Sequence, residues 1–246
     1  MKKNHELPID VPRGQTQEGV NQKVISYLFE NFPKDIKLKA LDLPCGTLEF
    51  LTCVKQLFPD AELTGADIFA PEKKAGINFR QMDLTEDFTI PEDQKFDLVT
   101  TISGVMMFSN TLRFVKNAAD KLLPGGTFIL TNDNNATIKD RLAYFFLGRY
   151  RIFNLVFEDN QVMTENVPVN ELVRLIRTHG IRIDDIEYTS FSLKDLVFAP
   201  FALVAYLSQW LYLKRLNTQL PQKLISEMYP FKQLLCKHYI IRGTKI

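Results

Sequence analysis

The sequence predicts an α/β fold, in which a mostly parallel β-sheet carries helices on both faces. Short apolar runs alternate with segments of helical periodicity, and parallel strands need such crossover helices between them. The 246 residues, of which 46% are hydrophobic and 24% charged, have the composition of a folded globular protein. This length suits one large domain with sizeable insertions, so we expect a single domain over residues 1–246.

The first half of the chain holds most of the expected strands. Before them, a helix is predicted over residues 17–32, because Val20, Val24 and Leu28 recur at helical spacing. Apolar runs that are each followed by a turn or a helix predict strands at residues 39–43, 61–67, 77–83, 95–103 and 126–132.

Helical patterns lie between several of these runs, at residues 50–58 and 112–122. The sequence Pro124-Gly125-Gly126 is expected to end the second helix and to turn the chain into the next strand.

The pattern loosens after residue 133. A helix is expected over residues 170–178, ended by Gly180, and it leads to a strand at residues 181–188. The last strand is expected at residues 238–243, and the long segment before it is too long for a plain connection. We therefore expect an apolar cap built from two insertions, at about residues 133–165 and 190–235.

Composition excludes several classes of function. The formal net charge is +1, which gives no electrostatic reason to expect a nucleic-acid partner. Cys45, Cys53 and Cys236 are scattered and form no CxxC pair, which argues against a disulfide framework and against a metal site. The N-terminus has no apolar segment of the secretory kind. These features favour a cytoplasmic protein.

Acidic and small residues cluster where the first four predicted strands end. Asp42 closes the first strand and Gly46 follows it, Asp67 and Asp83 end the second and third, and Ser103 follows the fourth. In an open parallel sheet, ligands bind beyond the carboxyl ends of the strands. A carboxylate about twenty residues past a glycine turn suits the two hydroxyl groups of a ribose, which places this interpretation on Asp67.

The segment Leu41-Asp42-Leu43-Pro44-Cys45-Gly46-Thr47-Leu48 resembles the first motif of the class I methyltransferases that use S-adenosyl-L-methionine. FDLVTTIS resembles the fourth-strand motif of that family, and LLPGGTFIL its entry to the fifth strand. The resemblance covers residues ~20–188 and the final strand.

The resemblance implies a Rossmann-like, seven-stranded, mostly parallel sheet with an antiparallel last strand. It implies S-adenosylmethionine as cofactor and methyl transfer as activity, with Asp67 at the ribose and Asp83 at the adenine edge. The cofactor-binding residues that it implies are Asp42, Pro44, Cys45, Gly46, Asp67, Ile68, Asp83, Leu84 and Ser103.

Two residues depart from the family's glycines. Pro44 takes the place of the first glycine, which a turn with negative φ accepts. Leu48 takes the place of the last, whose usual role is close packing of helix on strand. Two interpretations follow, an active methyltransferase and a catalytically silent binding module on the same fold. A nicotinamide-dependent oxidoreductase would need two further glycines after Gly46, and the stretch GTLEFL lacks them. We therefore discount that class.

Methyl transfer needs alignment of the acceptor and exclusion of water more than it needs reactive side chains. For an acceptor that must lose a proton, Asp133 and His5 are the candidate bases. His179 is expected at a helix C-terminus on the surface, and His238 is expected to be structural.

Two stretches outside the first motif bear on the acceptor. Arg149, Tyr150 and Arg151 suit either an anionic acceptor or an apolar helix with snorkelling arginines. Residues 105–108, Val-Met-Met-Phe, suit either the cavity floor near the methyl group or the core.

Residues 196–213 carry no charge, although Pro200, Ser208 and Gln209 lie inside them. As a helix they would extend ~27 Å, just short of the ~30 Å hydrocarbon core of a bilayer. Three placements remain: a buried cap helix, the wall of an apolar acceptor pocket, and peripheral contact with a membrane. Burial is expected, because large exposed apolar patches are rare. We expect a small or lipid-like hydrophobic acceptor.

Overall fold

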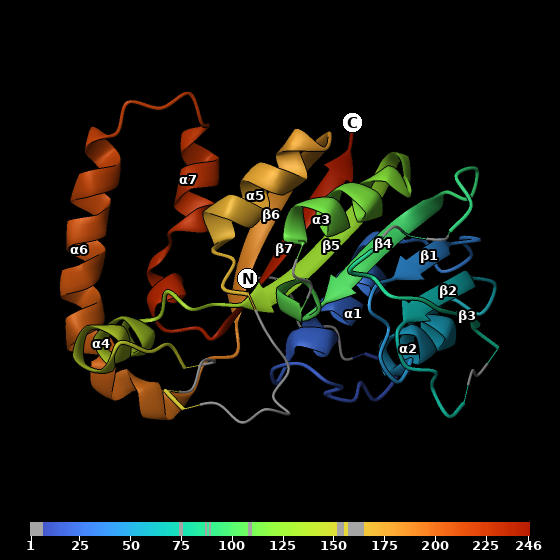
Figure 1. The fold of residues 1–246 in the computed structure, drawn as a ribbon, viewed down its shortest axis with the longest axis horizontal. Coiled ribbons are helices and arrows are strands. Elements are labelled where there is room, and N and C mark those ends of the chain that lie inside the picture. The colour runs from blue at the N-terminus through green and yellow to red at the C-terminus, as the bar shows by residue number, and fades with distance from the viewer. Residues whose placement is uncertain are drawn as a thin grey trace.

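A computed structural model describes residues 7–73, 76–86, 88, 90–107, 110–151, 155–156 and 165–246. Within these residues seven strands form one sheet in the order β3-β2-β1-β4-β5-β7-β6 (Figure 1). The strands are β1 (Lys39–Asp42), β2 (Glu62–Asp67), β3 (Asn78–Gln81), β4 (Phe96–Ile102), β5 (Leu122–Asp133), β6 (Ile181–Thr189) and β7 (His238–Lys245). Strand β7 runs antiparallel to both β5 and β6, and the other pairs of neighbouring described strands are parallel. The predicted fold class is confirmed.

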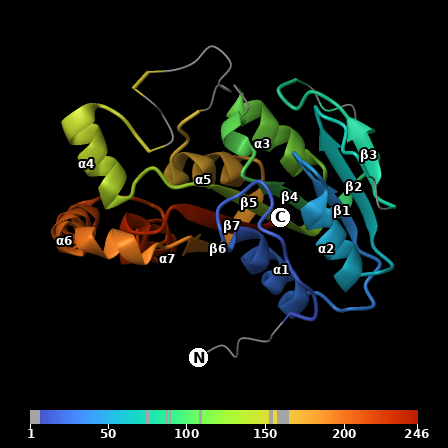
Figure 2. The same ribbon diagram turned by 90° about the horizontal axis from the view of Figure 1, so that it is seen from below.

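Helices cover both faces of the sheet. Helices α1 and α2 lie on one face, and α3 and α5 lie on the other (Figure 2). The helices of the described chain are α1 (Val20–Asn31), α2 (Glu49–Leu57), α3 (Thr111–Asp120), α4 (Ile138–Leu147), α5 (Val169–Thr178), α6 (Ala199–Arg215) and α7 (Gln222–Met228). Three 3₁₀ segments accompany them, at Val105–Met107, Leu193–Phe198 and Phe231–Leu234.

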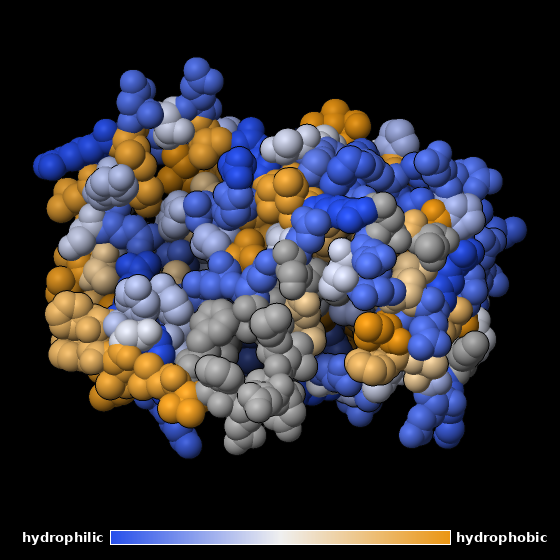
Figure 3. Space-filling model, viewed as in Figure 1, coloured by the Kyte–Doolittle hydropathy of each residue, from blue (hydrophilic) through white to orange (hydrophobic). Residues whose placement is uncertain are grey.

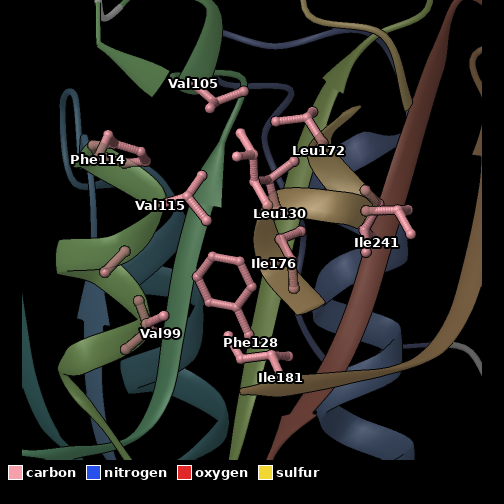
Figure 4. Packing of buried hydrophobic residues seen from close by; sticks show 14 of the residues in the cluster. Val99, Val105, Phe114, Val115, Phe128, Leu130, Leu172, Ile176, Ile181 and Ile241 are labelled. Carbon is pink, nitrogen blue, oxygen red and sulfur yellow. The ribbon is translucent and has the colours of Figure 1, made fainter. Parts of the chain in front are cut away.

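The core is divided by the sheet into two apolar layers. On one face, Phe128 and Leu130 of β5 meet Val115 of α3 and Ile176 of α5, all buried (Figure 4). The opposite layer is built mainly from α1 and α2 packed on the other side of the central strands. Because both faces of β1, β4 and β5 are covered, buried residues follow one another along these strands instead of alternating with exposed ones. This packing holds their carboxyl ends in place beneath the site.

The segment Pro124-Gly125-Gly126 does not turn the chain between a helix and a strand, contrary to the prediction. Strand β5 already begins at Leu122, which pairs with Phe96, and the pairing then shifts so that Leu98 faces Thr127. Gly125 has φ +79°, a conformation that glycine adopts without strain. The glycines therefore form an irregularity inside the strand. Strand β3 is also shorter than the predicted 77–83.

Helices α4, α6 and α7 and the segment Phe231–Leu234 come from the two predicted cap insertions. Helix α6 is attached to α4 and to Phe231–Leu234 by a small cluster that includes Ile138, Ala202 and Leu234. The segment Leu193–Arg215 is long and apolar enough to cross a membrane: its most apolar stretch has a mean hydropathy of 1.6, and only 6% of that stretch is buried. The expectation that residues 196–213 are buried is therefore wrong.

Candidate cofactor and acceptor site

A cavity of about 580 Å³ lies beyond the carboxyl ends of β1, β2 and β4, within the size range of small-molecule sites. Its wall contains all nine residues that the family resemblance implied, from Asp42 in β1 to Ser103 after β4. The topology brings them together because parallel strands end at the same edge of the sheet. Their role in binding stays a prediction.

A hydrogen bond links the loop after β1 to the acid that ends β2. The backbone N–H of Gly46 donates to Oδ2 of Asp67 at 2.9 Å, and the backbone N–H of Phe69 donates to Oδ1 at 3.1 Å. A carboxylate accepts up to about four hydrogen bonds, so Asp67 retains capacity for two hydroxyl donors. This free acceptor capacity fits the two hydroxyl groups of a ribose, which supports S-adenosylmethionine as the group bound here.

Leu48 lies outside the described wall of this cavity. It caps α2 with φ 66° and is buried. A Cβ atom added to Gly65 of β2 would stand 2.8 Å from Cδ2 of Leu48. The glycine that close helix–strand packing requires is therefore supplied by β2, and Leu48 occupies the space that Gly65 leaves. The family's third glycine and this leucine are two solutions to the same packing problem.

Asp42 is a buried acid in the cavity wall, 2% exposed. The Thr100 hydroxyl donates to Oδ1 of Asp42 at 2.6 Å. Burial raises the pKa of Asp42 to about 7, and the nearby charge of Asp67 adds to the rise against the opposing hydrogen bond from Thr100. Burial also raises the pKa of the Cys45 thiol, so Cys45 stays neutral and contributes as a small apolar group.

The opposite wall combines an exposed acid with apolar side chains. The Thr85 hydroxyl and backbone N–H donate to Oδ1 of Asp83 at 2.7 and 2.9 Å, and both bonds lower the pKa of Asp83. Ile68 and Phe69 stand exposed at the rim. A fixed carboxylate beside apolar side chains suits a flat heterocycle with an amino edge.

Sequence analysis missed the N-terminal part of the wall, which includes Gln15, Thr16 and Asn21. The side-chain amide of Asn21 donates to the backbone oxygens of Pro12 and Arg13. Its Oδ1 atom is buried and has no hydrogen-bond donor within the described residues. An orphaned buried acceptor in a cavity wall suits a cationic group of the ligand. The amphipathic pattern of residues 17–32 was visible, but periodicity alone does not separate a core residue from a wall residue.

His238 was predicted to be structural, and it lies behind Ser103 of the cavity wall without lining the described cavities itself. It is fully buried, and its Nε2 atom lies 3.3 Å from the Ser103 hydroxyl. Its Nδ1 atom lies 3.5 Å from Oδ1 of Asp133, an electrostatic contact rather than a well-formed hydrogen bond. The Ser103 hydroxyl in turn contacts that of Thr16 at 2.6 Å.

His238 and Asp133 differ in their protonation. Burial lowers the pKa of His238, against the opposing charge of Asp133, so the imidazole is neutral at pH 7. Burial raises the pKa of Asp133, but the contacts with His238 and Arg151 outweigh it and hold that pKa below its usual value. A neutral imidazole has one unprotonated nitrogen, which can accept a proton.

A second cavity, of about 650 Å³, lies under α4. Its wall mixes aromatic side chains, among them Tyr144, Phe145 and Tyr239, with the polar groups of Arg141 and Asn166. A smaller cavity of about 420 Å³ lies between the two. It shares Thr16 and Ser103 with the cofactor cavity and Asp133 with the second cavity.

The other predicted residues are dispersed. His5 and Phe108 lie outside the described residues. His179 ends α5 as predicted, away from the described cavity walls. Met107 lines the cofactor cavity, while Val105 is in the core.

The basic–aromatic stretch contributes one cavity-wall residue, Tyr150, and one half-buried arginine, Arg151. Tyr150 stacks on Tyr144 at 4.9 Å between ring centres and lines the second cavity. The Arg151 backbone N–H donates to Oδ1 of Asp140 at 2.8 Å, and its guanidinium lies 3.4 Å from Asp133. Arg151 therefore pairs with acidic side chains of the protein itself. In the part of the chain that the structure describes, no group of His, Cys, Asp or Glu side chains could hold a metal ion.

Comparison with known proteins agrees with this geometry. Residues 14–178 match the family model described as a methyltransferase domain. A solved S-adenosylmethionine-dependent methyltransferase from Archaeoglobus fulgidus is similar, with TM-score 0.56 and 15% identity, over 92% of this chain and 94% of that chain.

Two further solved structures illustrate the range of the fold. The geranyl diphosphate C-methyltransferase of Streptomyces coelicolor A3(2) has TM-score 0.54 and 8% identity, over 92% of this chain and 79% of that chain. The [4+2]-cyclase SpnF has TM-score 0.54 and 15% identity, over 91% and 80%. At these identities the solved structures show the fold alone, and no curated protein matches the chain in sequence. The family model covers more than half of the chain, and the chain therefore belongs to the class I S-adenosylmethionine-dependent methyltransferases.

Proposed function

We propose that the protein transfers the methyl group of S-adenosylmethionine to a hydrophobic, lipid-like acceptor held under α4. The observation that carries the proposal is the row of neighbouring cavities, which joins the cofactor wall to an aromatic-lined space through shared residues. Bound S-adenosylmethionine supplies a methyl group activated by its positive sulfonium. The remaining tasks fall to the protein's own side chains: they hold the two reactants in line and exclude water.

The cofactor side of the proposal assigns one task to each wall. Asp67 accepts the ribose hydroxyls, and Asp83 with Ile68 holds the adenine. Asp42 and the orphaned oxygen of Asn21 favour the positive charges of the cofactor. The interpretation as a silent binding module drew on Leu48, and its position against Gly65 weakens that alternative.

The acceptor side combines an apolar surface with few polar groups. Tyr144, Phe145 and Tyr239 present aromatic surface, and Arg141 is a cation in the same wall. Such a wall suits a hydrophobic chain with a small polar or anionic head. One structural neighbour is described in complex with geranyl diphosphate, a molecule of that kind. The likeness is one of fold alone, so it is an analogy.

A proton relay completes the proposal for an oxygen or nitrogen acceptor. As the acceptor takes the methyl group, its proton passes to Oγ of Ser103, and the Ser103 proton passes to Nε2 of His238. Asp133 stabilises the imidazolium that results, because its carboxylate faces Nδ1. Asp133 thus acts through His238 as a positioning residue, in place of the general base predicted from sequence.

The test uses S-adenosylmethionine with a labelled methyl group and a panel of acceptors. The panel contains a long-chain fatty acid, a prenyl diphosphate, a long-chain phenol and matched water-soluble analogues. We expect label in the organic phase with wild type, and none with Asp67→Ala. Label that enters only the water-soluble analogues would contradict the hydrophobic acceptor while leaving the enzyme assignment intact. A cytoplasmic location at the periphery of a membrane also remains a proposal.

A further inference from the structure

The end of the molecule farthest from β3 carries an exposed apolar face. Helices α4 and α6 lie at this end in both ribbon views (Figures 1 and 2). Orange side chains gather over them in the space-filling view (Figure 3). We define the apolar face by the exposed apolar residues of α4, of the segment Leu193–Phe198 and of α6: Tyr144, Phe145, Phe146, Leu147, Leu193, Leu196, Val197, Phe201, Leu203, Val204, Leu207, Trp210, Leu211 and Tyr212.

The apolar face is far larger than scattered surface residues would make. Phe145 is 80% exposed, and the other members have roughly half or more of their surface in water. With large side chains of this kind, the face presents on the order of 1,000 Å² of apolar surface. Soluble monomers rarely expose patches above a few hundred Å², so this face calls for a partner.

The apolar face lies in the strongly basic part of the chain. Residues 134–151 and 190–237 hold ten lysines and arginines against three acids, a formal charge of +7 in a chain whose total is +1. The three acids are paired within the protein: Asp195 lies 3.6 Å from Lys139 and 3.1 Å from Lys237, Asp140 binds Arg151, and Glu227 lies 3.6 Å from Lys223. The excess positive charge therefore faces the solvent.

The exposed basic residues flank α6 at both ends. Lys194 precedes the helix, and Lys214 and Arg215 end it. No ion pair is recorded for these three side chains within the described residues. The Lys214 ammonium lies 5.1 Å from the centre of the Trp210 ring, a pairing that is common where a helix meets lipid headgroups.

From this combination we infer that the apolar face docks on the surface of an anionic lipid bilayer. The apolar side chains enter the boundary between headgroups and acyl chains, and the flanking lysines and arginines contact lipid phosphates. A bilayer meets both the apolar centre and the basic margin of the face.

A second copy of the chain fits less well. A symmetric dimer places the same surface on both sides of the interface, so it would bring two regions of charge +7 together. The connections of α6 to its neighbours exclude a helix that spans the membrane. The chain enters α6 from β6 and leaves into α7, whose Leu224 and Ile225 are buried in the main core. Both ends of α6 therefore stay on the same side of a bilayer.

Docking would bring the second cavity to the lipid. Tyr144 and Phe145 belong both to the apolar face and to the wall of that cavity. A lipid-like acceptor could then enter under α4 without crossing water. This consequence rests on the proposed function, whereas the docking surface itself does not.

The test is flotation of the purified full chain with vesicles in the absence of cofactor. Vesicles of phosphatidylcholine alone are compared with vesicles that contain about one third phosphatidylglycerol, at low and high salt. We expect flotation with the anionic vesicles at low salt, and at least tenfold weaker binding to phosphatidylcholine alone or at high salt.

Matched variants separate the contribution of the apolar side chains from that of the basic side chains. Leu207→Glu removes an exposed leucine of α6, and Leu112→Glu removes an equally exposed leucine of α3; the two side chains are 51% and 55% exposed. Only Leu207→Glu is expected to weaken binding, by at least tenfold. Lys214→Glu with Arg215→Glu should weaken it by roughly thirtyfold, whereas Lys34→Glu with Lys37→Glu, on the far loop, should leave it unchanged.

Three results would overturn the inference. The first is wild type that stays unbound to anionic vesicles at low salt. The second is equal binding by the two leucine variants, both shown to be folded by circular dichroism. The third is a dimer whose dissociation requires Leu207→Glu, which would assign the face to a second copy. Because no methyl transfer is measured, none of these results bears on the proposed reaction.

Discussion

Asp42 makes the stability of this protein depend on pH in an unusual direction. Its folded-state pKa is about 7, whereas an aspartate in an unfolded chain has a pKa of about 3.9. Between these values the folded state binds a proton that the unfolded state has lost. The free energy of unfolding therefore falls as pH rises from about 4 to about 7. The contribution is fully present below pH 4 and lost above pH 7.

The magnitude follows from the shift. Three pKa units correspond to about 4 kcal/mol, an upper figure because water and small rearrangements relieve part of the cost. Asp42→Asn keeps the shape and an oxygen for the Thr100 hydroxyl, but it carries no charge. At pH 8 we expect the variant to exceed wild type by about 2–4 kcal/mol of unfolding free energy. At pH 5 the difference should shrink by about half or more, as wild type gains its proton.

Urea denaturation of both proteins at several pH values measures this difference directly. Subtracting the two curves removes the titration of every other group that the substitution leaves unperturbed. A difference that stays constant between pH 5 and pH 8 would refute the assigned pKa. A difference that grows toward low pH would refute the sign.

The same residue links pH to the cofactor. S-adenosylmethionine is positively charged, so its binding favours the ionised form of Asp42 and should release a proton below pH 7. Calorimetric titration in two buffers of different ionisation enthalpy measures that release. We expect it in wild type and not in Asp42→Asn, whose affinity should also be lower.

Three further variants probe the rest of the site. Leu48→Gly should cost about 1–3 kcal/mol of stability by chemical denaturation, because lost burial outweighs the relief of a left-handed backbone. It should leave cofactor affinity within about tenfold, and a large gain in affinity would mean that the leucine fills cofactor space. Asp67→Ala should weaken cofactor binding by about 1.5–3 kcal/mol in calorimetry, and equal affinities would contradict the ribose role. His238→Gln should lower kcat about a hundredfold or more with cofactor affinity nearly unchanged. Loss of the low-pH limb of the rate profile in that variant would separate a proton acceptor from a merely structural histidine.

Local patterns predicted the parts of the fold that local physics controls. A strand buried on both faces, such as β4, does not alternate strictly between apolar and polar residues, and the adjacent Leu98 and Val99 in the run at residues 95–103 showed it. Gly125 was misinterpreted for a related reason. Glycine with positive φ serves both a turn and an irregularity inside a strand, and only the pairing of Leu122 with Phe96 tells them apart.

Exposure of α6 could not be predicted, because the segment is apolar on all sides. Without a polar stripe, periodicity shows no preferred face, and the answer depends on how many elements pack around the helix. The structure places Ala202 inside and leaves Leu207 and Leu211 in water.

Some of the site residues could also be predicted from the sequence, and others could not. Asp42 and Asp67 could be predicted, since each directly ends a strand whose place in the sheet is implied by the pattern. His238 and Asn21 could not, because their neighbours at the site lie far away in sequence. His238 meets Ser103 only after β7 has inserted between β5 and β6.

Calorimetric titration of S-adenosylmethionine into the wild-type protein tests the central claim most directly, since every role assigned above requires that the cavity beyond β1 and β2 binds it. We expect one molecule per chain, with a dissociation constant in the micromolar range, equivalent to about 8 kcal/mol. No detectable heat with millimolar cofactor and folded protein would contradict the claim.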